Sequence, residues 1–169
     1  VTEPLPVILE RKPYGKARAS RSEVDRGESE ARPRPEVAEW FVRRGYVVVY
    51  QDCRGRYDSE GHFVKYLQDG EDGYDTIEWI ARQPWCDGRV ATIGLSYAAH
   101  TQVAAACLAP KALAAMVVDC GGFSNAYRSA IRNGGAFEMK QVTWAFNQAC
   151  ESPLAQSDPV VRAALAQEN

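Results

Sequence analysis

One stretch of the sequence, from Arg89 to His100, restricts the fold of this chain more than any other. Val90–Ile93 is a short apolar run rich in β-branched residues, which is typical of a buried parallel strand. Gly94 ends the run, and an alanine-rich segment of helical composition follows Ser96 and continues to Leu108. The pattern therefore predicts a strand, a tight turn that contains Ser96, and a helix.

A serine in such a turn has two interpretations. Between a strand and a helix, G-x-S-x-G is the pattern of a nucleophilic serine, because the strained turn lifts the hydroxyl above the sheet. The flanking residues must be small where the two backbones approach each other; Gly94 meets this need, and Ala98 stands in place of the second glycine. In the other interpretation Ser96 is only the N-cap of the helix, a position that serine favours.

Strand and helix patterns alternate along most of the chain. Leu5–Leu9, Tyr46–Tyr50 and Leu113–Val118 are predicted strands, and the unbroken apolar run of the second predicts burial on both faces. Helical spacing predicts helices over Glu36–Val42 and Asp69–Arg82. This alternation indicates an α/β fold, a parallel sheet with helices on both faces, whose ligands bind at the carboxyl ends of the strands.

The composition argues against several classes of protein. The chain has 169 residues and a formal net charge of −2, so nothing favours nucleic acid or an acidic membrane as a partner. There is no apolar run that could span a bilayer and no signal-peptide core; without an initiator methionine, the chain is either processed or begins within a longer sequence. The five cysteines are scattered without a C-x-x-C pair, which indicates reduced thiols in a cytoplasmic protein with no metal site and no cofactor. The sequence does not predict an oligomeric state.

The alternation stops after Phe123. Gly134–Glu138 opens a long helical pattern that includes Phe137 and Trp144, and a last short helix is predicted after Asp158. Helices inserted after a strand of such a sheet either form a lid over the site or are an extension that only packs.

Four ordered motifs resemble those of the CocE/NonD hydrolases, the group of cocaine esterase, α-amino-acid ester hydrolases and X-Pro dipeptidyl-peptidases. Arg11–Lys16 is similar to an R-x-P-Y-x-K turn, and Asp52–Phe63 to a D-x-R-G…S-x-G-x-F segment. Asp72–Val90 resembles the helix and turn that precede the nucleophile, and Gly94–Tyr97 resembles a G-x-S-Y elbow. The sequence departs from the family's elbow pattern at Ala98, where the family usually has glycine.

The resemblance implies an incomplete α/β-hydrolase fold and a Ser-Asp-His mechanism. Ser96 would attack the carbonyl of a small ester, amide or X-Pro peptide substrate and form an acyl-enzyme. The backbone N–H of Tyr97 and the hydroxyl of Tyr14 would then stabilise the oxyanion. The alternative for Tyr14 is a ring that only packs against its turn.

The resemblance also implies what the chain lacks. Residues 1–122 would be a partial hydrolase core and residues 123–169 the beginning of a helical cap domain, with the catalytic acid and histidine after Asn169. Asp119 ends a predicted strand but precedes the position of the family's acid, so it has no assigned role. His100 should point away from Ser96, and His62 occupies a variable position of its motif. We therefore expect this chain alone to be inactive and to expose an unpaired, apolar sheet edge.

Two features of the sequence each have two interpretations. Asp52 and Arg54 could act in catalysis, but an ion pair or turn hydrogen bond that fixes the loop is the favoured interpretation. For the whole protein, the main hypothesis is a serine hydrolase, and the alternative is a hydrolase-like binding or scaffold domain without catalysis.

Overall fold

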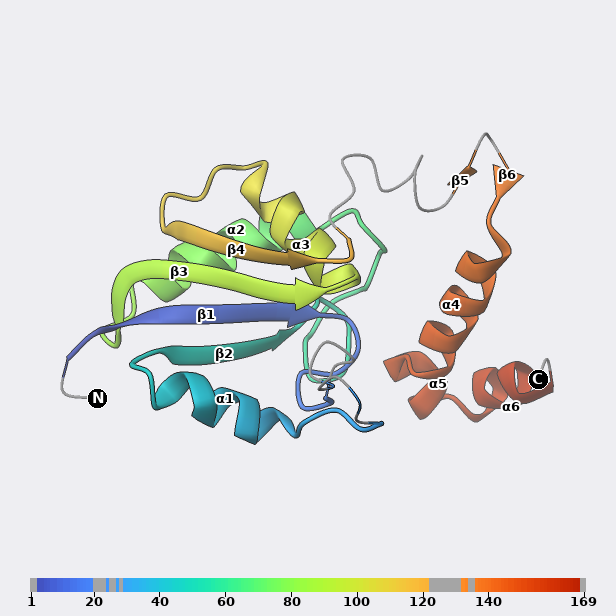
Figure 1. The fold of residues 1–169 in the computed structure, drawn as a ribbon. Helices are drawn as coiled ribbons and strands as arrows, with labels where there is room; N and C mark the ends of the chain where they lie inside the picture. The colour runs from blue at the N-terminus through green and yellow to red at the C-terminus, as the bar shows by residue number, and fades with distance from the viewer. Residues whose placement is uncertain are drawn as a thin grey trace.

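A computed structural model of the chain describes residues 3–19, 24, 27, 29–121, 132–133 and 136–167. The first part contains the strands and helices of an α/β unit, and the last part is mainly helical (Figure 1). In chain order the elements are β1 (Leu5–Lys12), α1 (Arg34–Val42), β2 (Val47–Asp52), α2 (Asp69–Ala81), β3 (Cys86–Leu95), α3 (Tyr97–Ala106), β4 (Leu113–Asp119), β5 (Arg132–Asn133), β6 (Ala136–Phe137), α4 (Met139–Cys150), α5 (Pro153–Ser157) and α6 (Pro159–Gln167).

The main sheet is parallel, with strand order β2-β1-β3-β4. From β1 to β2 the chain moves toward one edge of the sheet. From β2 to β3 and from β3 to β4 it moves toward the opposite edge. Because crossovers between parallel strands are right-handed, α1 lies on one face and α2 and α3 lie on the other (Figure 1). The predicted α/β architecture is therefore confirmed.

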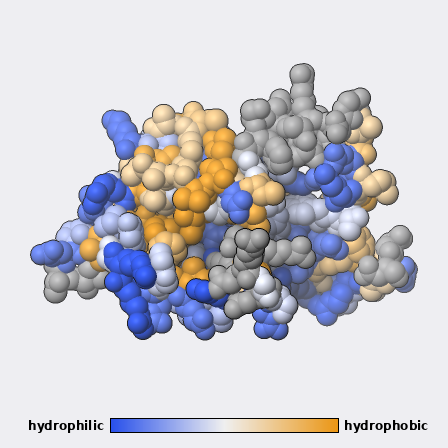
Figure 2. Space-filling model, in the orientation of Figure 1, coloured by the Kyte–Doolittle hydropathy of each residue, from blue (hydrophilic) through white to orange (hydrophobic). Residues whose placement is uncertain are grey.

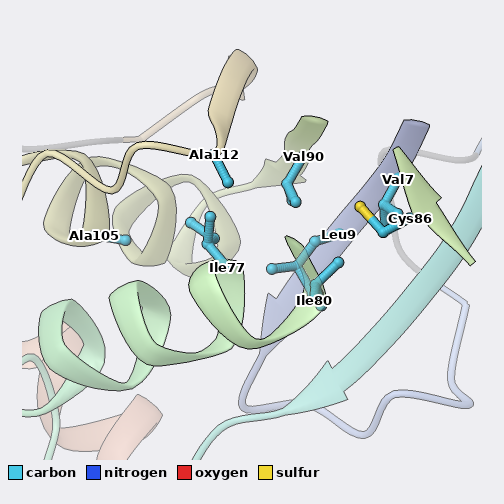
Figure 3. Close-up of a cluster of buried hydrophobic side chains, with 8 residues drawn as sticks. All are labelled: Val7, Leu9, Ile77, Ile80, Cys86, Val90, Ala105 and Ala112. Carbon is cyan, nitrogen blue, oxygen red and sulfur yellow. The ribbon is translucent and has the colours of Figure 1, made fainter. Parts of the chain in front are cut away.

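The apolar core lies between the sheet and the helices α2 and α3. Figure 3 shows its centre, where Leu9 of β1 and Val90 of β3 meet Ile77 and Ile80 of α2 and Ala105 of α3. Ile77 and Ile80 are three residues apart, so they share the face of α2 that turns toward the sheet. This core fixes the strand ends at which the candidate site lies.

Two strands are longer than their apolar runs. β1 continues through Lys12, although the prediction ended it at Leu9, and β3 begins at Cys86, before the apolar run that starts at Val90. In β1 the buried charges have partners: Arg11 Nε donates to Gln51 Oε1 at 2.7 Å, and Glu10 forms an ion pair with Arg34. Charged residues can lie in a buried strand when they are paired. A prediction from hydropathy alone therefore placed the end of β1 too early.

Two other predictions are corrected in part. β2 is half-buried rather than buried on both faces, because it forms one edge of the described sheet. Phe137 belongs to the short strand β6, and the helix that was predicted around it begins at Met139. The start of the predicted helical region, residues 123–131, and Gly134 and Gly135 lie outside the described residues.

The other edge of the described sheet is β4, and it carries exposed apolar side chains. Met116, Val117 and Val118 are 41%, 64% and 39% exposed, and Figure 2 shows apolar atoms gathered over this region. The expected apolar edge is therefore present, and such edges favour pairing with further strands. None of the helices in the described part of the chain is long and apolar enough to cross a membrane.

Candidate active site

Ser96 lies in the turn between β3 and α3, as predicted, at the carboxyl end of the sheet. Its backbone has φ 60° and ψ −111°, a left-handed value of φ that is strained for a residue with a Cβ atom. The turn is held by backbone bonds: Ser96 N–H donates to the carbonyl of Asp119 at 2.9 Å, and its own carbonyl accepts from Ala99 and His100 at 3.1 Å. Ser96 occupies the N-cap position, but in the described structure its side chain makes no capping hydrogen bond and the residue is exposed. The hydroxyl is therefore available for other chemistry.

Close backbone approach explains the small residues around this turn. A Cβ atom at Gly94, whose φ is +147°, would lie 2.4 Å from Cβ of Ala98. A Cβ atom at Gly121 would lie 2.5 Å from the carbonyl oxygen of Ser96. Alanine is accommodated at position 98 because position 94 has no side chain, so the departure from the family pattern does not disrupt the turn.

Gly94→Ala is expected to lower the free energy of unfolding by about 3 kcal/mol, since it adds both an unfavourable φ and a clash with Ala98. The measurement is urea denaturation of the variant and the parent. Gly88→Ala is the matched control: its φ is +90°, but nothing lies within 4 Å of its Cβ position, so a loss of only about 1 kcal/mol is expected. Equal losses in the two variants would show that the contact with Ala98 does not constrain the turn.

Tyr14 follows β1 and lies beside Ser96. The two residues line one cavity of about 290 Å³, together with Glu10, Lys12, Ala19, Leu95 and Ala98. The hydroxyl of Tyr14 accepts a hydrogen bond from Trp144 Nε1 at 3.2 Å. Burial raises the pKa of Tyr14 above its usual value, and hydrogen bonds from Trp144 and from the Ser96 side chain oppose that shift. Tyr14 is therefore neutral at physiological pH and keeps a proton to donate.

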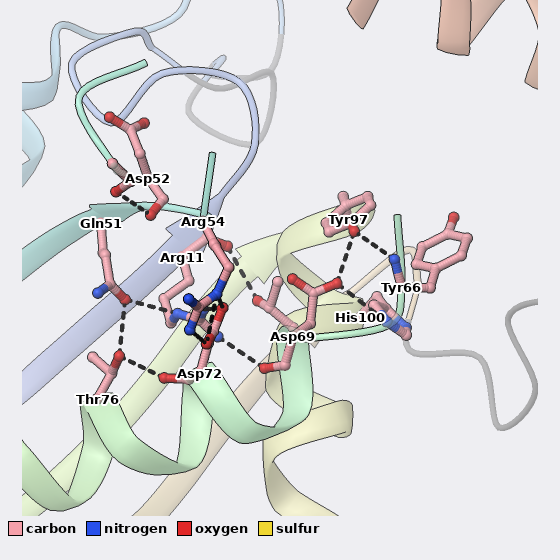
Figure 4. A network of polar contacts seen from close by, with 12 residues as sticks. Arg11, Gln51, Asp52, Arg54, Tyr66, Asp69, Asp72, Thr76, Tyr97 and His100 are labelled. Atoms are coloured by element: carbon pink, nitrogen blue, oxygen red, sulfur yellow. Dashed lines mark hydrogen bonds and ion pairs between the residues drawn. The ribbon is translucent and has the colours of Figure 1, made fainter. Parts of the chain in front are cut away.

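Tyr97 is the first residue of α3, so its backbone N–H has no partner within the helix. Its side chain is anchored away from that N–H: the hydroxyl donates to Asp69 Oδ2 at 2.7 Å and accepts from Tyr66 N–H at 3.0 Å (Figure 4). Burial raises the pKa of the Tyr97 hydroxyl, and the negative charge of Asp69 raises it further by a smaller amount. This buried anchor fixes the start of α3, where the N–H of Tyr97 lies next to Ser96.

Asp52, the last residue of β2, and Arg54, in the loop after it, have the structural roles that were favoured. Asp52 Oδ1 accepts the backbone N–H of Lys16 at 2.6 Å, and its Oδ2 lies 3.3 Å from Lys16 Nζ. Arg54 Nε lies 3.0 and 3.2 Å from the two carboxylate oxygens of Asp72 (Figure 4). Asp52 thus holds the turn that carries Tyr14, and Arg54 ties its loop to α2.

The two histidines have different surroundings. The ring of His100 lies against Tyr66, at 4.5 Å between centroids, and its Nε2 is 3.7 Å from Asp69 Oδ2. Within the described residues neither ring nitrogen of His100 has a hydrogen-bond partner, and burial lowers the pKa of this histidine. His62 is exposed in its loop. His100, which was expected to point away from Ser96, has its ring directed toward Asp69 and Tyr66.

Trp144 and Arg56 are site residues that the sequence did not reveal. Trp144 belonged only to a helical apolar pattern, and nothing in that pattern connects it with Tyr14, which lies 130 positions earlier. Arg56 is buried and donates to the carbonyl of Pro13 at 3.0 Å and to that of Gln148 at 2.9 Å. Among the described residues, no cluster of three or more His, Cys, Asp or Glu side chains could hold a metal ion.

The chain has clear relatives of known class. Residues 1–169 match the family model for X-Pro dipeptidyl-peptidases (S15 family). Cocaine esterase from Rhodococcus sp. (strain MB1 Bresler) is 43% identical over 105 residues, which make up 61% of this chain and 16% of that protein. This chain therefore spans only a small part of that curated relative's length.

Solved structures agree with this relationship. A CocE/NonD family hydrolase from Staphylococcus aureus matches with a TM-score of 0.70 at 27% identity, over 89% of this chain and 29% of that chain. An α-amino-acid ester hydrolase matches with a TM-score of 0.67 at 27% identity, over 89% of this chain and 26% of that chain. The predicted resemblance to CocE/NonD hydrolases is thus confirmed, and the chain belongs to the X-Pro dipeptidyl-peptidase (S15) family of hydrolases, of whose α/β-hydrolase fold it contains a part.

Proposed function

We propose that the protein is a serine hydrolase that cleaves ester or amide bonds through an acyl-enzyme on Ser96. The observation that carries this proposal is the shared cavity of Ser96 and Tyr14 at the carboxyl end of the sheet. In it, an exposed hydroxyl on a strained turn lies beside a neutral phenol that can donate a hydrogen bond. The names of the relatives, cocaine esterase and α-amino-acid ester hydrolase among them, support ester, amide or X-Pro peptide bonds in small substrates.

The mechanism follows from these positions. Ser96 Oγ attacks the substrate carbonyl, and negative charge develops on the carbonyl oxygen. The N–H of Tyr97 and the hydroxyl of Tyr14 donate to that oxygen, and because both are fixed beforehand, little reorganisation accompanies the reaction. The intermediate then collapses: the bond from the carbonyl carbon to the leaving oxygen or nitrogen breaks, and the alcohol or amine departs with the proton that the general base took from Ser96 Oγ. Water, deprotonated by the same base, then hydrolyses the acyl-enzyme, and the proton returns to Ser96.

The proposal requires a general base and an acid from outside the described residues. The sequence contains two histidines; His62 is exposed in a loop, and the ring of His100 faces Asp69 and Tyr66. Neither ring is hydrogen-bonded to Ser96 in the described part of the chain, and a base must come within about 3 Å of the hydroxyl that it deprotonates. We therefore propose that residues 1–169 alone lack hydrolytic activity.

We also propose a division into a partial core, residues 1–122, and the beginning of a helical cap, residues 123–169. In support, α4 reaches back to the candidate site: Trp144 bonds Tyr14, and Gln148 bonds Arg56. A cap that covers a site needs such contacts, whereas an extension that only packs does not need to touch Tyr14.

A fluorophosphonate probe tests the proposed nucleophile, since it labels only activated serines. In the full-length gene product, label is expected on the tryptic peptide 90–111, in which Ser96 is the one serine. Ser152→Ala is the matched control, because the hydroxyl of Ser152 only caps α5 by accepting a hydrogen bond from the N–H of Ala155 at 3.2 Å. Labelling of the 90–111 peptide should persist in this variant. An unlabelled 90–111 peptide would favour the alternative of a domain without catalysis.

A further inference from the structure

The contact between Trp144 and Tyr14 has a defined direction. An indole nitrogen can only donate a hydrogen bond, so the oxygen of Tyr14 must be the acceptor in the 3.2 Å contact with Trp144 Nε1. A phenolic oxygen that accepts on one side directs its own proton elsewhere. Tyr14 also lines the cavity that it shares with Ser96, where the carbonyl oxygen of a substrate attacked by Ser96 would accept that proton.

The indole ring is held in place by its neighbours. It stacks on Tyr97 with 6.0 Å between ring centroids and 4° between planes, and the ring of Phe63 lies 6.3 Å away. In addition, Lys65 Nζ lies 3.7 Å from the ring centroid of Trp144, in the geometry of a cation–π interaction. A ring fixed this way presents its N–H in one direction.

The two chain segments that carry this pair are joined by one buried side chain. Arg56 Nε donates to the carbonyl of Pro13, directly before Tyr14, at 3.0 Å. Its other nitrogens donate to the carbonyl and to Oε1 of Gln148, one turn after Trp144 in α4, at 2.9 and 2.8 Å. The distance between the turn of Tyr14 and α4 is therefore set by a rigid guanidinium.

We propose that the indole N–H of Trp144 positions the hydroxyl of Tyr14, so that its proton points at the carbonyl oxygen of a substrate attacked by Ser96. The inference rests on the proposed function and adds a positioning residue from α4 to the oxyanion site. A hydrogen bond donated to the oxygen of Tyr14 also polarises its O–H bond, which makes the phenol a better donor. Burial raises the pKa of Tyr14, whereas the hydrogen bond from Trp144 lowers it, and this lowering agrees with the polarisation.

Trp144→Phe in the full-length gene product tests the inference, because it keeps an aromatic ring beside Tyr97 but removes the N–H donor together with the second ring of the indole. Loss of one neutral hydrogen bond corresponds to a fall in kcat of about three- to tenfold, with KM changed less than about twofold. The assay is hydrolysis of p-nitrophenyl acetate. Trp40→Phe, in the exposed part of α1, is the matched control and should leave both constants unchanged.

A double-mutant cycle separates positioning from packing. In a Tyr14→Phe background, Trp144→Phe should produce no further loss of kcat, because the hydroxyl that it positions is absent. An equal loss in both backgrounds, or a normal kcat in Trp144→Phe, would overturn the inference. If Ser96→Ala remained active, the proposed function would be refuted. If activity needed Ser96 and Tyr14 but not the indole N–H, only the role of Trp144 would be refuted.

A spectroscopic measurement gives an answer even if Trp144→Phe does not fold. With ¹⁵N-labelled tryptophan, the indole N–H resonance of Trp144 should move in Tyr14→Phe, which removes its acceptor. The resonance of Trp40 should not move, because Trp40 packs on Phe41 and Arg44 at α1. If no indole resonance moved in Tyr14→Phe, the hydrogen bond that carries the inference would be absent.

Discussion

Ser96→Ala is expected to lower kcat for p-nitrophenyl acetate hydrolysis by about 10⁴-fold or more in the full-length gene product. The hydroxyl is the proposed nucleophile, and the methyl group of alanine cannot form the acyl-enzyme in its place. Alanine keeps the Cβ atom, the φ of 60° and the backbone bond to Asp119, so the turn should persist. The measurement is steady-state kinetics, with thermal unfolding to show that the fold is retained.

The size of the loss distinguishes the two interpretations of Ser96. A serine that only begins a helix would affect stability by about 1 kcal/mol and leave kcat unchanged. Ser152→Ala provides that comparison in the same chain, since its hydroxyl does make a capping bond. A kcat within about tenfold of the parent in Ser96→Ala would reject the acyl-enzyme on this residue.

Tyr14→Phe is expected to lower kcat by roughly a hundredfold, the effect of removing one donor of an oxyanion site. The second donor, the N–H of Tyr97, remains in place at the start of α3, which is why activity should not fall to the level of Ser96→Ala. KM should change little, because the bond forms mainly as charge develops on the carbonyl oxygen. The ring still packs edge-on against Tyr97, at 6.4 Å and 81°, so the fold should be retained.

The pH dependence gives this prediction a second measurement. Since burial raises the pKa of Tyr14, its proton stays on the oxygen at pH values up to its ordinary pKa of 10, and kcat should not fall through loss of this donor in that range. Tyr46→Phe, directly before β2, removes a phenol that lies against Phe41 and should be neutral for kcat. A normal kcat in Tyr14→Phe would return Tyr14 to a role in packing.

The parts of the fold that could be predicted are those that depend on local pattern. Apolar runs and helical spacing gave the order of strands and helices, and parallel strands bring their carboxyl ends to one edge. That rule placed Tyr14 and Ser96 together, and they line the same cavity. The extent of β1 was missed because Glu10 and Lys12 look like loop residues until their partners in other elements are known.

Long-range partners account for what the sequence could not give in the site. The bond from Trp144 to Tyr14 joins residues 130 positions apart, and the bonds of Arg56 to Gln148 join residues 92 positions apart. No periodicity encodes such pairs. The Asp69–Tyr97 anchor was missed for the same reason, since it appears only once α2 packs beside α3.

The position of β1 within the sheet has a consequence for synthesis of the chain. β1 is translated before the other strands of the described sheet but lies between two of them, where Val7 pairs with Val47 on one side and with Val90 on the other. At about 5 to 20 residues per second, Val90 leaves the ribosome roughly 4 to 17 s after Val7. During that time the side of β1 that will pair with β3 has no partner, so the core residues Val7 and Leu9 stay incompletely covered until after the nucleophile turn has been synthesised.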